Sequence, residues 1–195
     1  MGYWLCNVTV VDDDAKTVLP IYSELSSHEA EVTSDNERIL NADNAVVPAC
    51  AKEAICIHDR GGDCRVLLAA HPAVRRQFIV RQTGERHLFH QGQKRGFDFL
   101  TRKTHLKWTH TVEHIHKNKV RKRTYDCGAV QVSLDRNGES LWLVVMNGRE
   151  GGYCWLLCSF KDCASAKQAV ELALKFQSAH SFGMVGVHRA GRLAG

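Results

Sequence analysis

The sequence predicts a mixed α/β protein, and three observations support this prediction. Residues 54–57 (AICI) and 77–81 (QFIVR) are short apolar runs without alternation, which is typical of strands buried on both faces. A helical pattern lies between them, and alternating runs separated by turns follow from residue 86 onward. With 195 residues, 44% hydrophobic and 24% charged, the chain can bury a core and is too polar for a multi-pass membrane protein.

The first fifty residues predict a β-hairpin followed by a helix. Residues 3–11 and 17–23 are rich in β-branched and aromatic side chains, and the polar stretch DDDAK between them suits a turn. Residues 34–37 (SDNE) combine capping side chains with acids, as at a helix N-terminus, and an apolar stripe continues from Ile39 to Val46.

Residues 54–81 predict one βαβ unit. The first strand ends at the sequence HDRGGD, residues 58–63. Asp63, the last residue of this HDRGGD sequence, is well placed to cap a helix that runs to about His71. Because a second buried strand follows at residues 77–81, this order implies a parallel pair within one sheet.

The rest of the chain predicts antiparallel strands, a helix and a tail. Short alternating runs occur at residues 87–90, 106–115, 130–134, 141–146 and 153–160. An apolar stripe from Ala166 to Leu174 predicts a helix over residues 164–177. Residues 178–195 contain four glycines and no acid, so we expect them to be disordered.

The 8 cysteines favour reduced thiols in the cytoplasm over a disulfide framework. The first eleven residues have the pattern of a strand that runs into a turn, and the longest apolar runs are too short to span a membrane. No CxxC pair occurs, and Cys154 and Cys158 fall on one face of an expected strand. Two core cysteines explain this spacing more simply than a zinc site.

The charges are unevenly distributed along the chain. The formal net charge of +5 conceals −7 over residues 1–57 and +9 over residues 86–123. The densest basic stretch is KNKVRKR at residues 117–123, and other cations interleaved with aromatic residues precede it from Arg86 onward. Such a segment either neutralises the phosphates of a polyanion or forms a solvated hairpin tip, and the size of the imbalance favours the polyanion.

Asp59 is the sharpest candidate for a metal ligand. It lies at the carboxyl end of the strand that we expect to be most deeply buried, where ligands bind in open α/β sheets. Two glycines follow it and leave room for a divalent cation, but the Asp-Gly spacing alone favours a hydrogen bond to its own turn. The neighbouring His58 is either a general base or, more simply, a hydrogen-bonded structural residue.

Seven short motifs follow one another along the chain. They are LPIYSEL (residues 19–25), DNE (35–37), IHDRGGD (57–63), FIVR (78–81), GERHL (84–88), LWLVV (141–145) and WLLCS (155–159). In this order they resemble bacterial insertion-sequence transposases of the DDE class. The resemblance covers residues 3–177 and is most specific between Asp59 and Leu88.

The resemblance implies an incomplete ribonuclease H-like core with an antiparallel, β-rich insertion. Residues 1–85 would form the core portion, residues 86–160 the basic insertion, residues 161–177 a helix returning to the core, and residues 178–195 the tail. In the family, three carboxylates hold two Mg²⁺ ions, which promote DNA cleavage and strand transfer by in-line displacement. Asp59 matches the second carboxylate, so the resemblance implies that it is a catalytic metal ligand.

The other two carboxylates of the family have no clear match. The first belongs to a strand ahead of the region that Tyr3 matches. The third belongs to a helix that continues past Phe176, and Glu171 lacks the Arg that should precede it. We therefore expect a truncated or frame-disrupted transposase that does not cleave DNA by itself, holds Mg²⁺ poorly and retains DNA binding.

The expected ligand is double-stranded DNA at transposon ends, in the bacterial cytoplasm near the nucleoid. A homodimer or an association with a full-length transposase is also expected. No association with a membrane is expected. The expected phosphate contacts are Arg81, Arg86, Lys94, Arg95, Lys117, Lys119, Arg121, Lys122 and Arg123. Two other interpretations stay open: a non-catalytic module that modulates a full-length transposase, and a metal-dependent nuclease with an unfamiliar ligand set.

Overall fold

A computed structural model describes residues 3–11, 18–27, 34–46, 48, 54–73, 76–116, 119–180 and 186–189. Its largest element is a six-stranded mixed sheet with the strand order β3-β4-β10-β9-β8-β7. The strands are β3 (Ile55–His58), β4 (Gln77–Arg81), β7 (Trp108–His116), β8 (Lys119–Val132), β9 (Leu141–Gly148) and β10 (Tyr153–Ser159). The chain is therefore a mixed α/β protein, as the sequence predicts.

The predicted βαβ unit forms one edge of this sheet. Strands β3 and β4 are parallel, with Ile55 opposite Gln77 and His58 opposite Val80. The connection between them contains the 3-10 helix η2 (Arg60–Gly62) and α2 (Arg65–Ala73). The other strand pairs of the sheet are antiparallel, which confirms the expected change of pattern after the βαβ unit.

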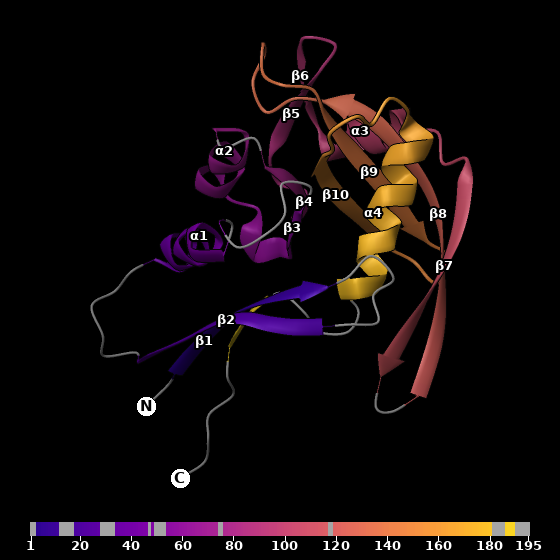
Figure 1. Ribbon diagram of the computed structural model, residues 1–195. Helices are drawn as coiled ribbons and strands as arrows, with labels where there is room; N and C mark the ends of the chain where they lie inside the picture. Colours follow the sequence, from indigo (N-terminus) through magenta and orange to yellow (C-terminus); the bar gives the residue numbers. More distant parts are fainter. Residues whose placement is uncertain are drawn as a thin grey trace.

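The sheet is covered on both faces. Helix α4 (Ala166–His180) packs Ala169, Val170, Ala173 and Leu174 against one face, which confirms the predicted apolar stripe. The other face is covered by α2, by α3 (Phe97–Lys103) and by the hairpin of β5 (His87–His90) and β6 (Gln93–Gly96). Figure 1 shows α4 in front of β8, β9 and β10, with α3 behind them.

A second, smaller sheet contains the chain's first strands. Its order is β11-β1-β2, built from β1 (Tyr3–Val11), β2 (Val18–Ser27) and β11 (Gly186–Arg189). The hairpin of β1 and β2 was expected. Helix α1 (Asp35–Val46) starts with a capping box, because the Glu37 N–H donates to Ser34 Oγ at 3.3 Å and the Ser34 N–H donates to Glu37 Oε2 at 3.0 Å.

The structure differs from the sequence expectations in three places. Strand β4 pairs with β10, so the main sheet runs across the expected division at residue 85. Helix α3 was not expected, because seven residues are too few to show a helical period. Within the expected disordered tail, α4 continues to His180 and β11 pairs with the edge of β1. No helix among the described residues is long and apolar enough to cross a membrane.

Candidate nucleic-acid interface and the Asp59 turn

Asp59 stands directly after β3 and opens the turn that leads to α2. It is the N-cap of η2, in an extended conformation with φ −74° and ψ −163°. Its Oδ1 accepts a hydrogen bond from the Gly61 N–H at 2.9 Å. This is the turn-forming role that the Asp-Gly spacing favours. One carboxylate oxygen is thus engaged locally, at the carboxyl end of a parallel strand.

The described residues around Asp59 do not form a two-magnesium site. Among the parts of the chain that the structure describes, Asp59 belongs to no group of three His, Cys, Asp or Glu side chains close enough to share an ion. The nearest acid in sequence, Asp63, is engaged elsewhere, and Glu171 lies exposed on α4 with its carboxylate 3.7 Å from Lys167 Nζ. Mg²⁺ needs several oxygen ligands in octahedral geometry, which one carboxylate does not supply.

Asp63 connects the Asp59 turn to the loop after β4. Its Oδ2 accepts hydrogen bonds from the Thr83 N–H at 2.7 Å and from Thr83 Oγ1 at 3.0 Å. Its Oδ1 forms a salt bridge with Arg86, whose Nη2 also donates to the Asp63 carbonyl oxygen at 2.9 Å. The carboxylate is only 1% exposed. Asp63 therefore joins two loops instead of capping α2 as expected.

Two of the expected phosphate contacts are half-buried in the protein. Arg86 is committed to Asp63, as described above. Arg81 is half-buried on β4, where its positive charge acts on the thiol of Cys154. Burial raises the pKa of Cys154, and the positive charges of Arg81 and Arg60 partly offset this rise. Of these two arginines, Arg86 joins the loop after β4 to the Asp59 turn.

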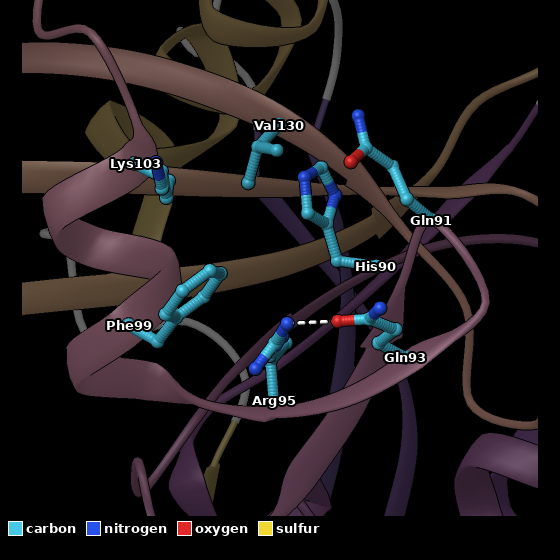
Figure 2. Close-up of a pocket in the computed structure, with 7 residues that line it drawn as sticks. All are labelled: His90, Gln91, Gln93, Arg95, Phe99, Lys103 and Val130. Atoms are coloured by element: carbon cyan, nitrogen blue, oxygen red, sulfur yellow. Dashed lines mark hydrogen bonds between the residues drawn. The ribbon is translucent and has the colours of Figure 1, made fainter.

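A basic hollow lies between the β5–β6 hairpin, α3 and β8. It has a volume of about 290 Å³ and is lined by His90, Gln91, Gln93, Arg95, Phe99, Lys103 and Val130. The Arg95 guanidinium carbon lies 4.4 Å from the centroid of the Phe99 ring, and Lys103 Nζ lies 5.9 Å from it. Figure 2 shows Arg95 donating to the Gln93 amide oxygen among the side chains that line the hollow. No lining residue is acidic.

The surroundings of this hollow are also basic. Residues 86–107 contain six Lys or Arg residues and one acid, Asp98. Lys94 on β6 and Arg102 on α3 are both exposed. The sequence identified Lys94 and Arg95, but Phe99 and Lys103 were not among the expected contacts. Their i, i+4 spacing brings them together only once residues 97–103 are known to be helical.

The second basic segment extends the β7–β8 hairpin. Pairing of β8 with β9 begins at Tyr125, so residues 119–123 pair with β7 alone and project beyond the sheet (Figure 1). Lys119 and Arg121 lie in β8 opposite His116 and His114, while Lys117 lies outside the described residues. Lys122 and Arg123 are exposed, and Arg123 Nε is 3.8 Å from Glu150 Oε2. Four of the five cations in this cluster therefore lie on β8, at the end of the hairpin that projects beyond the sheet.

His58 is buried, and two further residues that the sequence did not single out lie beside it. Its Nε2 is 3.3 Å from Asp43 Oδ2 on α1, and its ring centroid is 5.2 Å from that of His71 on α2. Burial, together with the neighbouring His58, lowers the pKa of His71 to about 4. Asp43 and His71 carry no sequence signal, because 28 residues separate them and only the packing of α1 on α2 joins them.

No family model matches this chain, and no curated protein matches it. The fold and the surface define it as a mixed α/β protein with a basic hollow beside α3 and an Asp-capped turn at the end of β3.

Proposed function

We propose that this chain is a DNA-binding portion of a DDE-class transposase, with an incomplete ribonuclease H-like core, and that it does not cleave DNA by itself. The observation that carries the proposal is the acid-free hollow in which Arg95 and Lys103 flank Phe99. The parallel β3–β4 pair with Asp59 at its carboxyl end also supports it, since the resemblance places the second carboxylate there.

The hollow suits a phosphate backbone better than a neutral ligand. Arg95 and Lys103 are cations on neighbouring elements, so they can neutralise phosphates and release condensed counterions. Phe99 offers an aromatic face between them, and His90 and Gln93 add further polar groups around a bound sugar or phosphate. The projecting β7–β8 hairpin adds a second group of cations along the same chain.

Cleavage would need carboxylates that the described residues do not bring to Asp59. The Asp59 turn is instead a preformed element that would need two more carboxylates to hold Mg²⁺ ions. Those ions would supply the activated nucleophile and stabilise the leaving oxygen in the complete family site. For this chain the proposal is binding of double-stranded DNA without metal-dependent cutting.

The binding is tested by fluorescence anisotropy of a labelled duplex between about 50 and 200 mM salt. The double variant Arg95→Gln/Lys103→Gln removes the two cations beside Phe99. We expect weaker binding at every salt concentration, and a plot of log affinity against log salt that is shallower by about two units, one for each lost phosphate contact. Unchanged affinity and slope would exclude the hollow as the DNA contact.

A matched control is the double variant Lys161→Gln/Lys167→Gln. It removes the same charge from two exposed lysines outside the hollow, one of them on α4 at the opposite face of the sheet. We expect a much smaller change in slope. Incubation of supercoiled plasmid with the chain and Mg²⁺ tests the second half of the proposal: nicking that Asp59→Ala removes would show that the chain does cleave DNA.

A further inference from the structure

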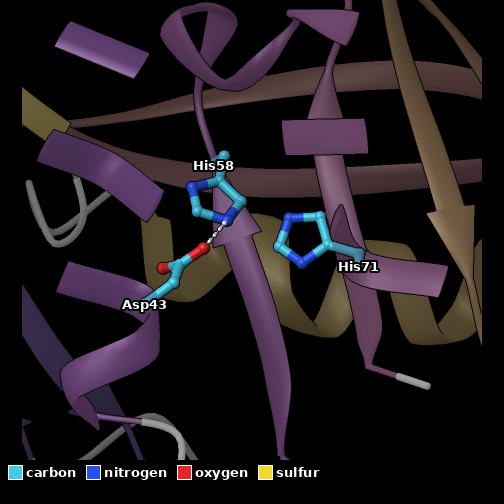
Figure 3. Close-up of side chains that lie close together, drawn as sticks. All are labelled: Asp43, His58 and His71. Atoms are coloured by element: carbon cyan, nitrogen blue, oxygen red, sulfur yellow. Dashed lines mark ion pairs between the residues drawn. The ribbon is translucent and has the colours of Figure 1, made fainter. Parts of the chain in front are cut away.

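Three side chains from three elements meet beneath the Asp59 turn. Asp43 comes from α1, His58 from the end of β3 and His71 from α2 (Figure 3). One ligand atom from each can be chosen so that all three lie within 4.8 Å of one another. The three residues are 5%, 7% and 0% exposed, respectively, so the cluster is closed to bulk water.

The hydrogen bonding of this cluster is incomplete. Within the described residues, neither ring nitrogen of His71 has a hydrogen-bond partner, although the residue is completely buried. Its ring lies between His58 and Phe78, whose centroids are 5.2 Å and 5.1 Å away. Buried polar atoms in native proteins almost always have partners. The two unpartnered nitrogens of His71, close to the Asp43 carboxylate, therefore indicate that a binding partner of this cluster is absent from the structure.

We propose that Asp43, His58 and His71 form a binding site for one divalent transition-metal ion of the Zn²⁺ type. Two imidazoles and one carboxylate are ligands that Zn²⁺ accepts, whereas Mg²⁺ prefers an all-oxygen shell. Ligands at about 2.0–2.1 Å from a tetrahedral ion lie about 3.3 Å apart. The distance between His58 Nε2 and Asp43 Oδ2 is 3.3 Å, which already equals this spacing.

Ligation by the three residues would tie α1 and α2 to the end of β3. The site is separate from the carboxylate of Asp59, which caps the turn above, and it extends the proposed function without depending on it.

The test uses the full chain after treatment with a chelator. Zn²⁺ alone is titrated into it by calorimetry, and Co²⁺ is followed by absorption spectroscopy. We expect one Zn²⁺ per chain, a rise in melting temperature with Zn²⁺, and no comparable effect of Mg²⁺. The Co²⁺ spectrum should lack a thiolate charge-transfer band, since no cysteine belongs to the site. Failure of the folded chain to bind Zn²⁺ stoichiometrically, or a thiolate band, overturns the proposal.

Two variants locate the ion. His71→Phe keeps a ring stacked on Phe78, and Asp43→Asn keeps the shape of the carboxylate. Each should weaken Zn²⁺ binding by about 100-fold or more, since even partners outside the ligand shell change metal affinity about 10- to 100-fold. The control His105→Gln alters an exposed histidine and should bind as the unaltered chain does. Circular dichroism confirms folding; if His71→Phe is unfolded, Asp43→Asn decides. Full Zn²⁺ affinity in a folded variant of either residue overturns the assignment.

Discussion

Replacement of Asp63 by Asn should destabilise the protein strongly, although the change is isosteric. The Asn side chain can still accept from the Thr83 N–H through its oxygen, so the main loss is the charge that faces Arg86. The salt bridge joins a carboxylate that is 1% exposed to a guanidinium that is 23% exposed. After the substitution, the Arg86 cation stays near the protein interior without an anion.

The size of this effect follows from the burial of the pair. Removal of one partner from a fully buried ion pair costs about 3–5 kcal/mol, because the other charge is left uncompensated. Arg86 is partly accessible and can recover some hydration, which places the expected loss at about 2–3 kcal/mol. For a chain of this length, that corresponds to a fall in melting temperature of about 4–12 °C.

The measurement is urea unfolding of Asp63→Asn, of Arg86→Met and of the double variant, which gives the coupling energy of the pair. The control Asp135→Asn removes an exposed carboxylate and should change the free energy of unfolding by about 0.5 kcal/mol or less. The double variant should be more stable than the sum of the single losses predicts. A loss for Asp63→Asn no larger than that of the control, or a coupling energy near zero, would refute the reasoning.

Two further predictions concern the residues beneath the Asp59 turn. Gly62→Ala should lower stability by about 1–3 kcal/mol, because the new Cβ would lie 2.3 Å from His58 Cβ, whereas Gly96→Ala, with no neighbouring atom closer than 4.0 Å, should cost less in the same thermal melt. In metal-free protein, buried neutral His71 should contribute about 3 kcal/mol to the free energy of unfolding. This contribution is present above its unfolded pKa of about 6.5 and is lost as the pH falls toward its folded pKa of about 4. Asp43, His58 and Arg76 also act on this ring, so unfolding of His71→Phe over the same pH range isolates its share; an equally steep loss in that variant would contradict the prediction.

The elements that the sequence predicts correctly are those with a local cause. The βαβ unit follows from two apolar runs and a helix of the right length, and α1 follows from the Ser34–Glu37 capping box. The stripe on α4 repeats with the helical period, so its buried face could be read directly. In each case the information lies within a few residues of the element that it specifies.

What the sequence does not predict depends on contacts between distant residues. The pairing of β4 with β10 joins residues more than seventy positions apart, and no local pattern selects that partner. The hollow forms only because α3 places Phe99 and Lys103 beside Arg95, and α3 is too short to show a helical period in the sequence. Arg81 and Arg86 look like free cations in sequence. In the fold, Arg81 is half-buried on β4 and Arg86 forms a salt bridge with Asp63 from another loop.

The adjacent residues His58 and Asp59 belong to one turn, but their side chains have different partners. Strand alternation directs His58 inward to Asp43 and His71, and Asp59 closes the turn with the Gly61 N–H. Gly62 packs directly against His58. The turn can approach the buried cluster this closely only because residue 62 has no side chain. Since the Asp63–Arg86 pair holds the same turn from the β4 side, the position of the Asp59 carboxylate is fixed from two directions before any cation or DNA is bound. Movement of His58 toward a bound ion would therefore shift the turn that carries Asp59.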